Sequence, residues 1–181
     1  MEATDILDTE HRLIERLLNV VEIAANRLEQ SQPLRADFFL DVVAFIQNFA
    51  DAYHHSKEEK MLFTTMIECG FPAQGGPINV MLAEHEQARL YTQELQKATT
   101  QLVAGDETVK STVIRTARDY ALLLREHIVK EDTILFQMAF RLLSLSEQRQ
   151  LGEKFRLAEE ENTQTRTKYI ALLNRLEDEV S

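Results

Sequence analysis

The chain has 181 residues, of which 44% are hydrophobic and 28% charged, a composition typical of one globular domain and unlike disordered or collagen-like proteins. Its formal net charge of −10 argues against nucleic-acid binding, because such binding usually needs a clustered basic surface. The apolar stretches fall short of the roughly 20 residues of a membrane span, no signal-peptide pattern is present, and Cys69 is a lone cysteine. We therefore expect a cytoplasmic protein that binds neither nucleic acid nor membrane.

Apolar residues recur at intervals of three and four along most of the chain, which predicts helices with one buried face. Only 5 glycines and 3 prolines are present, too few for the many turns of a sheet protein. Polar, Gly-rich or Pro-rich breaks separate the segments. The predicted helices cover residues 6–28, 35–68, 78–103, the stretch from a cap at Asp106 or Ser111 to about 143, and a tail at 146–180.

Four long helices with short connections favour antiparallel neighbours. The expected fold is all-α, an up-down-up-down four-helix bundle over residues 1–145 with an additional C-terminal helix over residues 146–181. The tail has a narrow apolar stripe that includes Leu151, Phe155 and Leu173. We expect this stripe to pack on the bundle or on a partner, which would make a homodimer.

An internal repeat marks the candidate site. Residues 54–63 and 127–136 both read His, three residues, Glu, an acid, two residues, Leu, Phe. Glu10-His11 precedes the first copy and Glu84-His85 the second at almost the same distance. The chain therefore consists of two helix pairs, each with Glu-His on its first helix and His-x-x-x-Glu on its second.

Residues four apart lie on one face of a helix, so each motif can present two ligand atoms to one point. A single His-x-x-x-Glu is more often a surface hydrogen-bonded pair, but two copies in matching frames favour a shared metal site. The alternative is a bundle whose core histidines bond to core glutamates without metal. Four histidines with two carboxylates suit iron, manganese or zinc, and six ligands favour two metals over one closed zinc site. The candidate ligands are His11, His54, Glu58, His85, His127 and Glu131.

These motifs resemble the hemerythrin-like family, also called the HHE cation-binding domain, over about Asp5 to Leu143. The resemblance implies a centre of two iron ions joined by an oxo or hydroxo group, with zinc or manganese as substitutes. The four candidate histidines would be terminal ligands. Glu58 and Glu131 would bridge the two irons.

The chain departs from the oxygen-carrying members of that family, which place two histidines four apart on the third helix. Only His85 is available here, which argues against simple oxygen carriage. The missing histidine leaves one coordination position of the expected metal centre vacant. The residues considered for this vacant position are Glu15, Glu59, Glu84, Glu86 and the tyrosines Tyr53, Tyr91 and Tyr120. His55 is offset by about 100 degrees from His54 on a helix, so we interpret it as structural or exposed. An apolar shell that includes Phe63, Phe136 and Phe140 is expected around the site.

Three functions from different classes follow. The first is a non-haem di-iron protein that binds or reacts with a small oxidant such as dioxygen, peroxide or nitric oxide. The second is an iron- or oxygen-sensing regulatory module without turnover, in which the C-terminal helix transmits metal occupancy to a partner. The third is a helical interaction protein that needs no metal.

Overall fold

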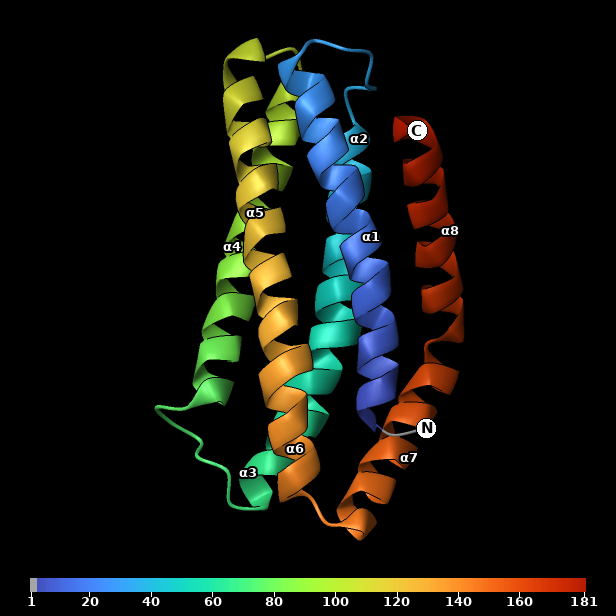
Figure 1. The fold of residues 1–181 in the computed structure, drawn as a ribbon. Coiled ribbons are helices and arrows are strands. Elements are labelled where there is room, and N and C mark those ends of the chain that lie inside the picture. Colours follow the sequence, from blue (N-terminus) through green and yellow to red (C-terminus); the bar gives the residue numbers. More distant parts are fainter. Residues whose placement is uncertain (1–2) are drawn as a thin grey trace.

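Four antiparallel helical rods form the body of the protein in the computed structural model, which describes residues 3–181 (Figure 1). The first rod is α1 (Ala3–Glu29), and the third is α4 (Pro77–Val103). The second comprises α2 (Phe38–Phe45), η1 (Ile46–His55), η2 (Glu58–Phe63) and α3 (Thr64–Glu68). The fourth comprises η3 (Glu107–Val109), α5 (Lys110–Lys130), η4 (Glu131–Leu135) and α6 (Phe136–Leu142). The described residues contain no strand, so the predicted all-α, up-down-up-down bundle is confirmed.

The turns between rods use the residues that the sequence predicts. Gly70 and Gly105 follow helix ends with φ of +94° and +97°, the left-handed region that glycine enters without a side-chain penalty. Pro77 begins α4 after an extended Gly76, a position where its missing N–H costs no helical bond. Asp106 accepts a hydrogen bond from the Thr108 backbone N–H, so Asp106 caps the entry to the fourth rod.

The predicted helical C-terminal segment is confirmed, but it forms two helices rather than one. They are α7 (Leu145–Glu161) and α8 (Thr163–Val180). The chain leaves the helical conformation at Asn162, whose φ and ψ are −106° and 13° and whose amide donates to the Ala158 carbonyl oxygen at 2.9 Å. A side chain that binds the backbone in this way competes with helix continuation.

Both tail helices pack on the bundle of their own chain, along α1 (Figure 1). Phe155, Leu173 and Leu176 are fully buried and belong to the apolar core. At the edge of this contact the Arg16 guanidinium donates to the Glu177 carboxylate at 2.6 Å. Packing on the bundle thus occurs within one chain, and a homodimer through this segment stays a prediction.

The apolar core is divided into two clusters along the bundle. One includes Ile14, Phe49 and Leu124, and the other includes Leu7, Leu62 and Leu135. On the first three rods the histidines and glutamates of the candidate site lie in sequence between the two clusters. On the fourth rod Glu131 does so, while His127 directly precedes Ile128 of the first cluster. Among residues 3–181 no helix has both the length and the apolar character needed to cross a bilayer.

Candidate metal centre

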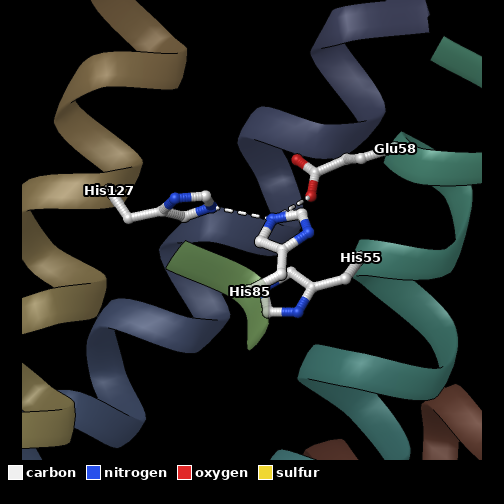
Figure 2. Close-up of side chains that lie close together, drawn as sticks. All are labelled: His55, Glu58, His85 and His127. Carbon is white, nitrogen blue, oxygen red and sulfur yellow. Dashed lines mark hydrogen bonds and ion pairs between the residues drawn. The ribbon is translucent and has the colours of Figure 1, made fainter. Parts of the chain in front are cut away.

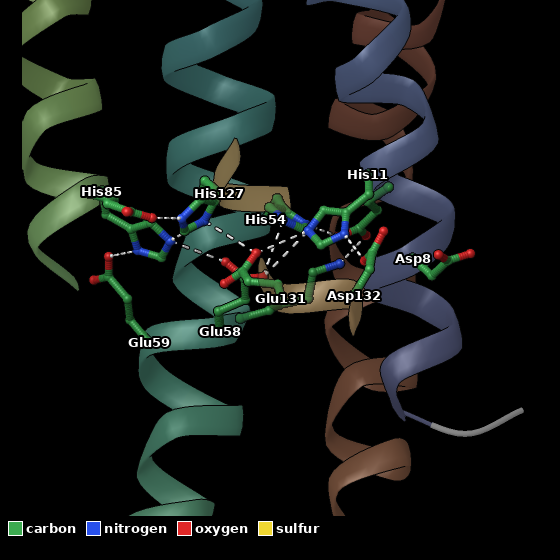
Figure 3. A network of polar contacts seen from close by, with 12 residues as sticks. Asp8, His11, His54, Glu58, Glu59, His85, His127, Glu131 and Asp132 are labelled. Carbon is green, nitrogen blue, oxygen red and sulfur yellow. Dashed lines mark hydrogen bonds and ion pairs between the residues drawn. The ribbon is translucent and has the colours of Figure 1, made fainter. Parts of the chain in front are cut away.

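All six predicted ligands lie buried at one level of the bundle. Each of the four rods contributes at least one of them, and none is more than 1% exposed. Figure 3 shows their side chains converging between the helices. The residues are His11 from α1, His54 from η1, Glu58 from η2, His85 from α4, His127 from α5 and Glu131 from η4. The repeat therefore brings together the side chains that the sequence analysis selected.

The two copies of the motif share a backbone irregularity. The bridging candidates Glu58 and Glu131 each begin a π-helical segment, η2 and η4, and His54 lies in another, η1. A π-helical turn contains more residues than an α-helical turn, and such turns are frequent at functional sites. The helix geometry thus departs from the regular α form where the glutamates enter the core.

The ligand atoms form two clusters. His11, His54, Glu58 and Glu131 make one, while Glu58, His85, His127 and His55 make the other (Figure 2), with the atoms of each within 4.8 Å of one another. Glu58 belongs to both clusters. Its carboxylate oxygens lie 3.3 Å from His54 Nε2 and 3.5 Å from His85 Nε2.

Glu131 also contacts both sides, because one of its oxygens lies 3.2 Å from the Nε2 atoms of His11 and of His127. Two carboxylates therefore lie between two groups of imidazoles. This arrangement suits a pair of neighbouring cations.

The outward nitrogen of each predicted ligand histidine donates a hydrogen bond to a carboxylate (Figure 3). His54 Nδ1 donates to Glu10 at 2.8 Å and His127 Nδ1 to Glu84 at 2.9 Å. The other two bonds cross from one half of the repeat to the other: His11 Nδ1 donates to Asp132 at 2.6 Å, and His85 Nδ1 donates to Glu59 at 2.7 Å. Each carboxylate in one half of the repeat has its counterpart in the other. These bonds fix the tautomer and aim all four Nε2 atoms inward, as is usual for histidines that bind metals.

Several inward atoms lack a hydrogen-bonding partner. Among the described residues, all four carboxylate oxygens of Glu58 and Glu131 and the Nε2 of His11 find none, although they are buried. The Nε2 atoms of His85 and His127 face each other at 3.0 Å, and in the neutral tautomer set by their Nδ1 bonds both carry lone pairs. Buried charges and opposed lone pairs are costly without a compensating cation. The residues present therefore fit a metal centre.

Protonation compensates these groups when metal is absent. Burial disfavours ionisation of Glu58, but His54 and His11 hold the pKa of its carboxyl well below the ordinary value. Burial likewise opposes protonation of His127, yet Glu131 and Glu84 raise its pKa to about 9. His11 behaves in the same way, since Asp132, Glu131 and Glu58 raise its pKa well above the usual range despite burial. Protons thus occupy positions where a cation would bind.

The comparison with known families agrees with this geometry. The sequence profile described as the Hemerythrin HHE cation binding domain matches residues 2–139. The chain belongs to this family.

Relatives of this HHE domain include uncharacterized proteins of Mycobacterium tuberculosis and Mycobacterium bovis. Each is 25% identical over 153 residues, an alignment that covers 84% of this chain. The alignment spans 59% of the length of these relatives. No solved structure matches the chain.

His55, which we interpreted from the sequence as structural or exposed, is not exposed, since only 2% of it is accessible; its side chain belongs to the second cluster. Its ring stacks on that of His85, with ring centres 3.9 Å apart and an angle of 12° between planes. Burial and the nearby charge of His85 lower the pKa of His55 to about 3. A sequence signal existed, since His55 precedes Glu58 by three residues, a spacing that also shares a helix face.

The acidic residues considered for the vacant position lie outside both clusters. Glu59 and Glu84 accept the histidine bonds described above. Glu15 binds the Arg12 guanidinium at 2.8 Å, and the side chain of Glu86 is 64% exposed. Among the tyrosines, the hydroxyl of Tyr53 donates to Glu159 on α7.

Aromatic rings of the repeated Leu-Phe pairs cover the site. Phe136 stacks on His11 with ring centres 5.5 Å apart, and Phe63 stacks on His85 at 6.1 Å. Both rings are at most 5% exposed and exclude water from the histidines. Phe140, which we expected in the same shell, is 50% exposed and lies outside it.

The two halves of the repeat differ in how their lysines are covered. Lys57 binds Glu10 and, at 2.7 Å, the carboxylate of Glu159 on α7, and it is 2% exposed. Its counterpart Lys130 binds Glu84, but its side chain is 34% exposed. The tail helix therefore covers one half of the centre and contacts its hydrogen-bonding network. This contact could not be predicted from the sequence, because nothing in the spacing of Glu159 relates it to the repeat.

Proposed function

We propose that this HHE domain is a non-haem di-iron protein that binds or reacts with a small oxidant such as dioxygen, peroxide or nitric oxide. The observation that carries the proposal is the pair of buried carboxylates, Glu58 and Glu131, between two sets of inward-facing imidazole nitrogens. Glu58 and Glu131 would bridge the two ions, and His11 and His54 would bind one of them. His85 and His127 would bind the other.

Two adjacent iron ions would supply the redox chemistry, because iron exchanges electrons with small oxidants and also accepts nitrogen and oxygen ligands. The chain contributes the surroundings of the ions. The four carboxylates on the Nδ1 atoms hold the imidazoles in one orientation and increase their basicity as ligands. Phe63 and Phe136 keep bulk water away from two of the histidines.

Anaerobic loading with ferrous iron, followed by metal analysis, tests this proposal directly. We expect two iron ions per chain and an absorption spectrum that changes on exposure to oxygen, peroxide, azide or nitric oxide. Glu131→Gln should lower the iron content, because it removes a shared charged ligand. Glu15→Gln is the matched control and should load normally, because among residues 3–181 Glu15 binds only Arg12, near the surface. A chain that retains no iron, or whose loaded form responds to none of these molecules, would refute the proposal.

A second candidate function, a sensing or regulatory module, is favoured by one specific contact. A chain of hydrogen bonds runs from His54 through Glu10 and Lys57 to Glu159 on α7. Metal bound at His54 would change the charge at the inner end of this series of hydrogen bonds, and α7 lies at its outer end. Metal removal should then increase protease cleavage within residues 145–181. Equal cleavage of the loaded and metal-free forms would exclude this function.

A further inference from the structure

The two halves of the repeat place equivalent apolar residues between their two rods. In the first half these residues lie between α1 and η2, a surface that we call the first groove. In the second half they lie between the start of α4 and η4, which we call the second groove. Both grooves have a buried floor that belongs to the same apolar core cluster. The floor residues are Leu7 and Leu62 in the first groove and their counterparts Met81 and Leu135 in the second.

The tail helix α7 fills the first groove, where it lies against α1 and η2 (Figure 1). Its Leu151 and Phe155 are at most 1% exposed and belong to the core cluster of the groove floor. Glu159, four residues after Phe155, binds Lys57 at 2.7 Å. One face of α7 thus carries two apolar side chains and then a carboxylate, each four residues after the last.

The second groove is open and has a volume of about 800 Å³. Val80 and Ile134 on its rim are 48% and 47% exposed, whereas their counterparts Ile6 and Met61 are partly buried and pack against the core cluster. In the part of the chain that the structure describes, no segment covers these two side chains as α7 covers their counterparts. Exposed apolar side chains above a buried apolar floor are typical of a surface that binds a protein segment.

The charges along the second groove favour an acidic partner. Lys130 lines the groove and binds Glu84, as Lys57 binds Glu10 in the first half. Among residues 3–181 Glu84 is the only acidic partner of Lys130, whereas Lys57 also binds Glu159. An ammonium group can donate three hydrogen bonds. Lys130 can therefore bind a second carboxylate, supplied from outside the chain.

One acidic residue lies near this position without blocking it. Glu126 occupies the position in the second half that Tyr53 occupies in the first. It is exposed and does not line the groove. A charge on the exposed surface is screened by water and salt, so the approach to Lys130 stays open to a carboxylate.

We propose that the second groove binds an amphipathic helix of a partner protein, with two apolar side chains four residues apart and a carboxylate four residues further on. The apolar side chains would cover Val80 and Ile134, and the carboxylate would bind Lys130. Lys130 binds Glu84, which accepts the hydrogen bond of His127, so the partner helix would contact the second half as α7 contacts the first. Two copies of this chain packed groove to groove are disfavoured, because two Lys130 side chains would meet. The inference goes beyond the proposed function and requires no bound metal.

A synthetic peptide with the sequence of residues 145–161, which carries the required pattern, is the probe. It is titrated into the ¹⁵N-labelled full chain, and binding is followed by NMR of the backbone amides. Zinc is present, so that any bound metal is diamagnetic. We expect saturable shifts of the Val80 and Ala83 signals at peptide concentrations below about 1 mM. No shift in this range, or shifts confined to residues around α7, would overturn the proposal.

A substitution on the rim of the groove tests the apolar contact. Val80→Asp places a charge where the proposal needs an apolar side chain and should weaken peptide binding at least about tenfold. Val103→Asp is the matched control, because Val103 is a valine of the same helix that is 45% exposed and lies outside the groove. It should leave the affinity unchanged. Equal affinities of the two variants would overturn the proposal.

Two charge-removing substitutions test the contact with Lys130. The Glu159→Gln form of the peptide should bind the unmodified protein about two- to fivefold more weakly. Lys130→Gln should bind the two forms of the peptide equally, because the charge pair is already lost. The same weakening in both proteins would overturn the proposed role of the carboxylate.

Sedimentation without peptide tests whether a second copy occupies the groove instead. We expect Val80→Asp to leave the oligomeric state of the full chain unchanged. A dimer of the unmodified chain that Val80→Asp dissociates would identify a second copy as the occupant and would overturn the proposal.

Discussion

Metal loading of this HHE domain should release protons, because the metal-free site holds protons where cations would bind. Burial opposes protonation of His11, His54 and His127, but neighbouring carboxylates raise the pKa of all three. Glu58 and Glu131 have lowered pKa values and are already ionised, so they release none. Histidine binds metal only when neutral. We expect up to about three protons per chain at pH 6, and the logarithm of metal affinity should rise by up to about three per pH unit.

The rise should become less steep above about pH 9, the approximate pKa of His127, because that histidine is then already neutral. Calorimetry of zinc binding in buffers of different ionisation enthalpy gives the proton count. His127→Gln should lower the count by about one, because glutamine carries no proton to release. Glu15→Gln is the control and should leave the count unchanged, because Glu15 lies outside both clusters and binds Arg12 near the surface. A count near zero at pH 6, or an affinity that is independent of pH from 6 to 8, would refute the reasoning.

The same pKa values give the metal-free protein a dependence of stability on pH. A histidine whose pKa is raised in the folded protein stabilises the fold fully at pH values below its pKa in the unfolded chain, near 6.5. This stabilisation is lost as the pH rises through the pKa of the folded protein. For His127, a shift to about 9 corresponds to roughly 3 kcal/mol. Urea unfolding should therefore show a metal-free protein that is less stable at pH 10 than at pH 6. The loss should be smaller in His127→Gln.

The remaining predictions concern the surroundings of the site and the tail. Lys57→Met should lower the free energy of unfolding by about 3–5 kcal/mol, because it leaves Glu10 buried without its cation. Lys130→Met should lower it by less than about 1 kcal/mol, because Lys130 is partly exposed. Equal losses of the two variants in urea unfolding would contradict this prediction. Glu84→Gln should weaken zinc binding about 10–100-fold by weakening the bond that orients His127, as competition with a chelator would measure. Leu173→Ala should cost about 2–5 kcal/mol because the side chain is fully buried, and a neutral effect on thermal unfolding would show that α8 is not part of the core.

Much of the fold could be predicted because its determinants are local. Helical periodicity, the scarcity of glycine and proline, and the breaks near Gly70 and Gly105 are read directly along the chain. The break at Asn162 escaped prediction, because one polar residue in a helical pattern is usually compatible with a continuous helix. Its effect depends on a side-chain bond to Ala158 that spacing does not specify.

The sequence by itself determined the six candidate ligands, since the repeated His-x-x-x-Glu fixes which side chains share a helix face and the bundle then brings the faces together. Only the tertiary structure decided the position of His55, the crosswise bonds from His11 to Asp132 and from His85 to Glu59, and the contact of Glu159 with Lys57. These contacts join residues on different rods, and their geometry depends on the rotation of each helix and on π-helical turns. A one-dimensional pattern sets which residues face the core, but packing decides which of them meet.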